Sequence, residues 1–251
     1  MKNIKLKVSD KILFVSPHFD DVIFSAGGYL SDVVKPKNAI VANVFTAIQN
    51  IPNSLSARRY LAHCNATDKN LLYKERDTED SVVFDHLSIL KINLGFVEAL
   101  WRTKNVGNVI RVLGKYIPEL LLMYPTYALH IVKGTIHKDD EKTINRLVRK
   151  LDKIIQRNNI TVVFGPMGVG QHIDHIIVRE AVKRLKDVSV VLWEDFPYST
   201  YSQSTYSDKE VFVHKPNWSK KVSLMKMYAS QYAGVFPQKP KQKNEVFIRL
   251  K

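Results

Sequence analysis

The amino-acid sequence predicts an α/β domain, in which a mostly parallel sheet is covered by helices on both faces. Short apolar runs rich in β-branched residues recur along the chain, and each has the length of a buried strand. Helical patterns separate these runs, so that a helix, a tight turn and an uninterrupted apolar strand follow one another. Right-handed crossovers then place the strands side by side, and a ligand is expected beyond their carboxyl ends.

The individual strands are predicted from their apolar and β-branched residues, which suit a sheet that is buried on both faces. No run approaches about 18 uninterrupted apolar residues, so we expect no membrane span. The predicted strands cover residues 12–15, 39–46, 89–94, 161–164 and 188–193, and a late strand is expected at 245–250.

The clearest helix is predicted for residues 142–157, because its apolar side chains recur every three or four positions and so share one face. Asp139 or Asp140 can cap its start. Further helices are expected at 174–185 and 218–232.

The segment 101–137 is harder to assign, because its helical pieces are interrupted by Pro118 and it carries no recognisable motif. We expect it to be an insertion or a lid beside the core. The prediction for the whole chain is therefore a single domain over residues 1–251.

The composition limits the class of protein and its partners. The formal net charge is +14, from 38 lysines and arginines against 24 aspartates and glutamates. The basic residues are scattered and aromatic residues are not interleaved with them, so we expect a solvated, lysine-rich surface rather than a nucleic-acid-binding protein. The one cysteine, Cys64, excludes an internal disulfide and a thiolate metal cage. The apolar run near residue 1 is too short for a signal peptide, and we expect a cytoplasmic protein.

Two polar loops carry the residues that suggest chemistry, and each follows a predicted strand. The first is Ser-Pro-His-Phe-Asp-Asp at 16–21, and the second is Gly-Gln-His-Ile-Asp-His at 170–175. Because the carboxyl ends of parallel strands meet at one edge of the sheet, the two loops should lie together. They would bring together His18, Asp20, Asp21, His172, Asp174 and His175.

This set of side chains suits a catalytic metal. Nitrogen and carboxylate ligands without sulfur are typical of a catalytic zinc, which takes three protein ligands and leaves one position open. Two adjacent carboxylates repel each other, and a cation removes that problem. Successive side chains in a loop point in different directions, so one of the pair Asp20 and Asp21 should bind the metal while the other stands beside the reacting water.

Each loop also has a plain structural explanation when it is taken alone. Asp20 or Asp21 can cap a helix, and His18 can be an ordinary loop histidine. In the same way, His172 and His175 can be surface residues at the start of a helix. It is the combination of the two loops at one edge that favours a site.

The two loops resemble the paired motifs of the PIG-L/LmbE family of zinc-dependent N-deacetylases. The neighbouring stretches 25–28 (Ser-Ala-Gly-Gly), 193–198 (Trp-Glu-Asp-Phe-Pro-Tyr) and 228–231 (Tyr-Ala-Ser-Gln) agree with this resemblance, which spans about residues 11–235. It implies a Rossmann-like fold and an enzyme that removes the acetyl group from an N-acetylated amino sugar of the N-acetylglucosaminide type. Such a substrate can be an antibiotic, thiol or glycoconjugate precursor.

The resemblance also implies roles for residues that match the family's motifs. His18, Asp21 and His175 would bind Zn²⁺, with Fe²⁺ or another divalent metal as an alternative for the same ligands. Asp20 would be the general base. A cationic His172 would stabilise the oxyanion and protonate the leaving amine.

Two positions depart from the family's usual pattern, which has proline at position 19 and glutamate at position 22. Here they are Phe19 and Val22, and neither is a ligand. Val22 removes a carboxylate that could have supported the ligands from behind.

Four further residues are expected around the site. Arg76 and Glu98 fall where family members place contacts to sugar hydroxyls, although Arg76 could instead pair with acidic residues on its own helix. Asp174 and Asp195 are expected to support the metal ligands, although Asp195 could equally cap a helix.

Two other functions remain open on these residues. A metal-dependent hydrolase of the same fold could act on another amide or on an ester bond. A non-catalytic protein could use its positive charge to bind an anionic partner, but a purely structural zinc site would be closed and would need no base. Neither the specific small-molecule substrate nor the oligomeric state follows from the motifs.

Overall fold

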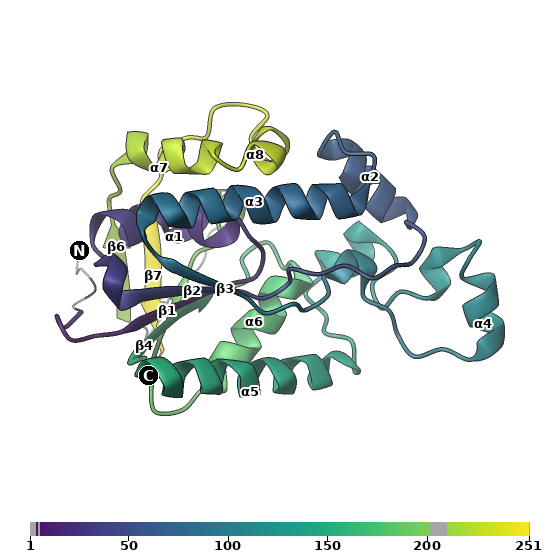
Figure 1. Cartoon of the computed structure of the whole chain (residues 1–251), viewed down its shortest axis with the longest axis horizontal. Coiled ribbons are helices and arrows are strands. Elements are labelled where there is room, and N and C mark those ends of the chain that lie inside the picture. The colour runs from purple at the N-terminus through teal and green to yellow at the C-terminus, as the bar shows by residue number, and fades with distance from the viewer. Residues whose placement is uncertain (1–3, 5, 201–209, 251) are drawn as a thin grey trace.

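A computed structural model describes residues 4, 6–200 and 210–250 of the chain (Figure 1). Its centre is a seven-stranded sheet with the order β3-β2-β1-β4-β5-β7-β6. The first five strands in this order run parallel, and β7 and β6 complete the sheet as antiparallel strands. The strands are β1 (Ile12–Ser16), β2 (Ala39–Asn43), β3 (Leu90–Asn93), β4 (Val162–Pro166), β5 (Ser189–Trp193), β6 (Glu210–His214) and β7 (Glu245–Arg249).

Helices cover both faces of this sheet, which confirms the predicted doubly wound α/β class. In Figure 1, α1, α3, α7 and α8 lie on one side and α5 and α6 on the other. The α-helices are α1 (Asp21–Asp32), α2 (Leu55–His63), α3 (Lys69–Leu87), α4 (Asn108–Leu113), α5 (Asp140–Asn158), α6 (Ile173–Lys183), α7 (Trp218–Lys226) and α8 (Ala229–Val235). Short 3₁₀ turns occupy Pro36–Asn38, Ala99–Trp101, Pro118–Leu120 and Tyr198–Thr200, and a π-helical turn occupies Tyr127–Ile131.

The core lies on both sides of β1 and β4, the two strands in the middle of the sheet. Every residue of these two strands is buried. Phe14 of β1 stacks on Phe164 of β4 with 4.7 Å between the ring centroids, and on Trp193 of β5 at 6.5 Å. The uninterrupted apolar runs are thus explained, because neither face of these strands meets water.

Among the differences between the structure and the predicted elements, two lie towards the C-terminal end of the chain. The strand β6 was not expected from the sequence. The helix expected at 218–232 is two helices, α7 and α8, because the chain turns at Tyr228. The buried hydroxyl of Tyr228 donates a hydrogen bond to Asp80 on α3 at 2.8 Å, which fixes this turn against the neighbouring helix.

The segment after Trp101 leaves the core and returns to it at the same point. Thr103 and Leu122 form an antiparallel bridge, and the Lys104 N–H donates to the Leu121 carbonyl at 2.9 Å. The short helix α4 lies in the excursion, the stretch of chain between Thr103 and Leu122, and projects from one end of the molecule (Figure 1). That this segment is an insertion or a lid within a single domain stays a prediction.

Helix α1, which begins at the first polar loop, is held at its other end by β7. The buried carboxylate of Glu245 accepts hydrogen bonds from the N–H groups of Gly28 and Tyr29 at 2.8 and 2.7 Å, and it pairs with Lys221 of α7 at 2.6 Å. A Cβ atom on Gly28 would lie 2.2 Å from the side chain of Pro216, so this close approach requires glycine. Among the described residues, no helix has the length and apolar character to cross a membrane.

Candidate active site

The two polar loops meet at the carboxyl edge of the sheet, as the sequence predicts. They follow β1 and β4, which are neighbours, and the strand order reverses between these two strands. This is the position at which open α/β sheets bind their ligands. Helices α1 and α6 both begin here, so that the positive ends of their dipoles face the same space.

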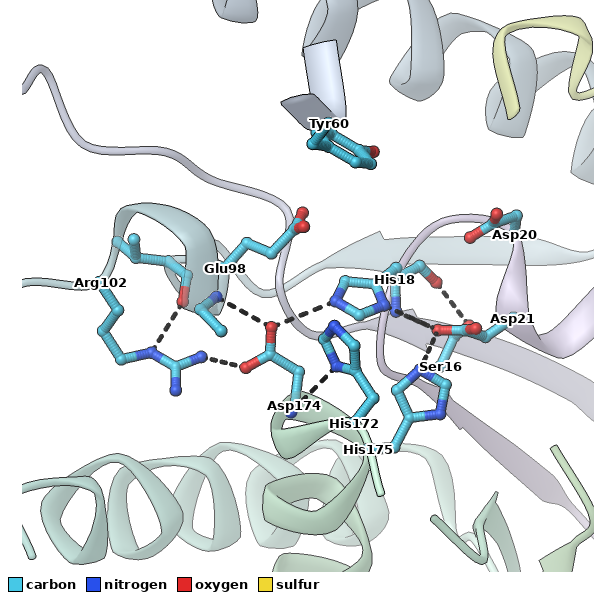
Figure 2. Close-up of polar contacts among 12 residues, drawn as sticks. Ser16, His18, Asp20, Asp21, Tyr60, Glu98, Arg102, His172, Asp174 and His175 are labelled. Carbon is cyan, nitrogen blue, oxygen red and sulfur yellow. Dashed lines mark hydrogen bonds and ion pairs between the residues drawn. The ribbon is translucent and has the colours of Figure 1, made fainter. Parts of the chain in front are cut away.

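Three side chains come close enough to share a metal ion. The Nδ1 atom of His18 lies 3.0 Å from Oδ2 of Asp21, and Nε2 of His175 lies 3.3 Å from the same oxygen. Possible ligand atoms of these three residues all lie within 4.8 Å of one another. Figure 2 shows the two imidazole rings and the Asp21 carboxylate converging on one point. They are the three side chains that the resemblance assigns to the metal.

Each histidine is held from behind by a carboxylate. Nε2 of His18 lies 3.2 Å from Asp174, and Nδ1 of His175 lies 2.7 Å from Asp195. The second oxygen of Asp195 accepts the Val169 N–H at 2.8 Å, so its position is fixed by the loop after β4. Both carboxylates therefore lie where the sequence analysis expected support for the ligands, and Asp195 is fully engaged in doing so rather than free to cap a helix.

Arg102, which the sequence analysis missed, completes this arrangement. Its guanidinium pairs with Asp174, donates to Asp140 at 2.8 Å and donates to the Val97 carbonyl at 3.0 Å. Arg102, Asp140 and Asp174 are all buried. The local sequence gave no signal for this pairing, because Arg102 and Asp174 are 72 residues apart and belong to different loops.

Asp20 has a different environment from its neighbour Asp21. Figure 2 shows the Asp20 carboxylate turned away from His18 and His175. Although Asp20 occupies the N-cap position of α1, its side chain makes no capping hydrogen bond to the described residues. It lies instead 3.6 Å from the guanidinium of Arg76. Helix capping therefore does not account for Asp20.

Arg76 faces the site and not the acidic residues of its own helix. One Nη atom lies near Asp20, and the other lies 3.4 Å from Glu98. The ring of Phe19, which stands where the family usually has proline, lies beneath the guanidinium with 5.6 Å between the charged carbon and the ring centroid. The phenyl ring thus offers Arg76 a cation–π contact that a proline could not.

His172 lies at the start of α6, and its ring is oriented by the backbone. Its Nδ1 atom accepts the Asp174 N–H at 3.3 Å, so a neutral ring carries its proton on Nε2. Burial, together with the charges of His18 and His175, lowers the pKa of His172 to about 3. These surroundings favour a neutral His172. The catalytic role that the resemblance implies for a cationic His172 stays a prediction.

The electrostatics of the cluster favour a bound cation. Burial lowers the pKa of His18, but the carboxylates of Glu98, Asp174 and Asp21 outweigh it and raise that pKa to about 10. Burial likewise opposes ionisation of Asp21, yet His175 and His18 hold its pKa well below the usual range. The carboxylates thus create a negative potential at the two histidines. The donor set, two imidazoles and one carboxylate without sulfur, is one that zinc and other divalent transition metals accept, so the residues fit a metal ion.

A cavity of about 590 Å³ opens from this cluster, and all the predicted catalytic and substrate-binding residues line it. Its wall includes residues that the sequence analysis did not assign. Tyr198 and Gln231 lie in stretches that had been noted for their resemblance to the family, so a signal existed for them. Tyr60 and Tyr127 come from α2 and the π-helical turn, for which no motif was available. Further lining residues are Phe24, Arg59, His63, Cys64, Leu100, Phe196 and Pro197.

When the chain is compared with known protein families, residues 13–186 match the family described as "PIG-L: GlcNAc-PI de-N-acetylase". A curated relative, 2'-N-acetylparomamine deacetylase of Streptomyces fradiae, is 28% identical over 194 residues. That alignment covers 75% of this chain and 58% of the relative, so the chain spans little more than half the length of the curated relative.

Solved structures of a deacetylase from the teicoplanin biosynthesis pathway share the fold. Its complex with bog has a TM-score of 0.76 and 22% sequence identity, and covers 95% of this chain and 97% of that one. The zinc-inhibited form of the teicoplanin deacetylase Orf2 has a TM-score of 0.75 and 20% identity, with the same coverage.

Proposed function

Because the chain belongs to the PIG-L family, we propose that it is a metal-dependent hydrolase that removes the acetyl group from an N-acetylated amino sugar. The family match covers both polar loops, at 16–21 and at 170–175. The curated relative that acts on N-acetylparomamine supports this substrate class. Zinc is the proposed metal, with iron as an alternative, and a cytoplasmic location stays a prediction.

The different environments of Asp20 and Asp21 carry the proposal. Asp21 lies between the two ligand histidines, whereas Asp20 faces the cavity beside Arg76. A site that merely stored a metal would have no use for a second, separate carboxylate in the cavity. Hydrolysis needs such a group, because a base must take a proton from the attacking water.

His18, Asp21 and His175 would hold the metal ion. When bound there, a divalent metal supplies Lewis acidity to the acyl group and lowers the pKa of a neighbouring water. Asp174 and Asp195 keep the two imidazole rings oriented, because each accepts a hydrogen bond from the ring nitrogen that faces away from Asp21.

Asp20 is the proposed general base and later the general acid. Burial and the adjacent Asp21 carboxylate raise the pKa of Asp20, which makes it a better proton acceptor than an exposed aspartate. Asp20 takes a proton from water as the water oxygen adds to the amide carbon. It then returns that proton to the nitrogen as the C–N bond breaks. The remaining proton of the added water passes from the acid product to the amine, so that acetate and the protonated amine are released.

His172 is the proposed donor to the developing oxyanion. Its Nε2–H faces the cavity, since Nδ1 is engaged by the backbone of α6. A neutral imidazole can donate this hydrogen bond without a change of protonation. Removal of one such donor typically lowers the rate about 10²–10³-fold.

Arg76 and Glu98 are the proposed contacts to the sugar. They pair with each other at 3.4 Å on the wall of the cavity, next to Asp20. The guanidinium offers donors and the carboxylate offers acceptors, which together match sugar hydroxyls. Burial raises the pKa of Glu98 to about 8, so a neutral carboxyl group could also donate.

The test is a screen of N-acetylated amino sugars with mass spectrometry as the readout. The panel contains N-acetylglucosaminides, acetylated aminoglycoside precursors and acetylated thiol-pathway conjugates, each assayed before and after chelation and after return of Zn²⁺ or Fe²⁺. We expect loss of one acetyl group from at least one class, abolition by chelation and recovery with metal. Activity that survived complete metal removal would contradict the mechanism, and cleavage of other amides or esters alone would favour the broader hydrolase.

A further inference from the structure

The chain carries an exposed apolar surface that the proposed chemistry does not use. Six large hydrophobic side chains between residues 109 and 117 are exposed, among them Tyr116 at 83% and Val109 at 74%. We refer to this group as the apolar tip. Its members are Val109, Ile110, Val112, Leu113, Tyr116 and Ile117.

The apolar tip points outward because the segment that bears it is fixed at its base. The Lys104–Leu121 hydrogen bond closes the excursion, and the Leu121 side chain fills the space over Gly114, where a Cβ atom would lie 2.3 Å away. Glu119 accepts the Leu55 N–H at 2.7 Å, which ties the excursion to α2. These contacts occupy the side of the segment that faces the protein, and the side chains of the apolar tip remain exposed.

Exposed apolar area of this extent needs a partner. Contiguous apolar patches on soluble proteins usually mark a surface that binds another protein, a ligand or a membrane. Leu120, which follows the tip directly in the chain, is also exposed. Large hydrophobic residues exposed elsewhere in the described part of the chain, such as Leu71 and Val82 on α3, lie apart from this group.

The charges within the tip identify the class of partner. Arg111 lies on α4 and Lys115 in the turn that follows it, and both are exposed among the apolar residues. A symmetric pairing of two copies would bring these like charges together, because the same patch meets itself across a two-fold axis. An anionic surface would attract them instead, and the net charge of +14 acts in the same direction.

We propose that the apolar tip docks on the surface of an anionic phospholipid bilayer. Val109, Tyr116 and their neighbours would enter the region between headgroups and acyl chains, and Arg111 and Lys115 would contact the headgroup phosphates.

The test is flotation with vesicles of phosphatidylcholine alone and with vesicles in which about one third of the lipid is phosphatidylglycerol. The whole chain should float with the anionic vesicles and stay behind with the neutral ones, and its binding should weaken as salt is added. Two double variants alter the tip: Val109→Ser with Tyr116→Ser, and Arg111→Glu with Lys115→Glu. Each should lower the affinity for the anionic vesicles at least about tenfold.

Matched control variants separate the tip from general properties of the surface. Leu71→Ser with Val82→Ser removes two exposed apolar side chains on α3, and Arg149→Glu with Lys153→Glu reverses two exposed charges on α5. Both controls should bind as the unaltered chain does. Equal losses in the tip and control variants would overturn the proposal in favour of charge-driven adsorption. A dimer that the tip variants abolish, without any vesicle binding, would overturn it in favour of a second copy.

Discussion

Arg102 pairs with Asp174 directly behind His18, a proposed metal ligand, so a buried positive charge stabilises the carboxylate that orients this histidine. Arg102 also neutralises Asp140 at the start of α5, and Tyr124 donates to the same carboxylate at 2.7 Å. One guanidinium thus joins the loop after β3 to the starts of α5 and α6.

Replacement of Arg102 by leucine should destabilise the protein strongly. Two buried carboxylates would be left without a counter-charge, and breaking a buried pair in this way costs about 3–5 kcal/mol of unfolding free energy. Urea denaturation measures the loss. Arg184→Leu is the matched control, because Arg184 pairs with Glu141 at the surface and should contribute less than about 1 kcal/mol. Similar losses of unfolding free energy for both variants would show that the buried Arg102 cluster contributes no more than a surface ion pair.

Asp20→Asn and Asp21→Asn should separate the two neighbouring aspartates. Asp20→Asn removes the proposed base and should lower turnover about 10²–10⁴-fold while the metal content stays unchanged. Asp21→Asn weakens a proposed ligand and should lower both the turnover and the metal content. Elemental analysis of the purified variants and a deacetylation assay give the two numbers for each. Full activity in Asp20→Asn would mean that the base has been assigned to the wrong residue.

Asp195→Asn should weaken metal binding although Asp195 is not a proposed ligand. The amide would still fill the space, but it would no longer present a carboxylate to Nδ1 of His175 at 2.7 Å. Loss of such a supporting group typically lowers metal affinity about 10–100-fold. Titration with Zn²⁺ against a competing chelator measures the affinity. Asp152→Asn, on the outer part of α5, is the control and should bind metal normally; equal affinity in all three proteins would remove Asp195 from this role.

The stability of the protein should depend on pH through Asp80. Burial raises the pKa of Asp80 from 3.8 to about 7, against the opposing effects of Lys91, Tyr228 and Asn43. A group whose pKa is raised by folding supplies stability that is fully present below its unfolded pKa. That stability is then lost as the pH rises through the folded pKa, here between about 4 and 7.

The Asp80→Asn variant tests this dependence by removing the titration. The difference in unfolding free energy between the unaltered chain and this variant should shrink by roughly 2 kcal/mol between pH 5 and pH 7. Asp77 contacts the same Lys91 at 2.6 Å, and its pKa is lowered by that contact despite the opposing effect of burial. Asp77→Asn should therefore differ from the unaltered chain by the same amount at both pH values. If Asp80→Asn also differed from the unaltered chain by the same amount at pH 5 and pH 7, Asp80 would not change its protonation in the folded protein over this range.

The sequence was sufficient for the centre of the sheet and for the residues of its two polar loops. β1 and β4 are buried on both faces, so their apolar runs are continuous and easily recognised. Topology then brings His18 and His175 together without any further information. The edge strand β6 was missed because only one of its residues, Phe212, is buried, so it lacks the continuous apolar run of the central strands.

Features that depend on contacts between distant segments could not be predicted. Arg102 has no local pattern that distinguishes it from a surface arginine, and its partners lie in other loops. The low pKa of His172 could not be expected for the same reason, because it depends on burial and on the neighbouring imidazoles. The position of Phe19 under Arg76 likewise follows from packing and not from the motif.

The contact between Glu245 and the N–H groups of Gly28 and Tyr29 also sets an order of assembly. Gly28 and Glu245 are 217 residues apart, so α1 cannot be fully held until β7 has been synthesised. A growing chain that already contains His18, Asp21 and His175 still lacks this hold on the helix that begins at Asp21. Firm metal capture should therefore come late in synthesis, and a partly made chain would compete poorly for the metal with finished copies.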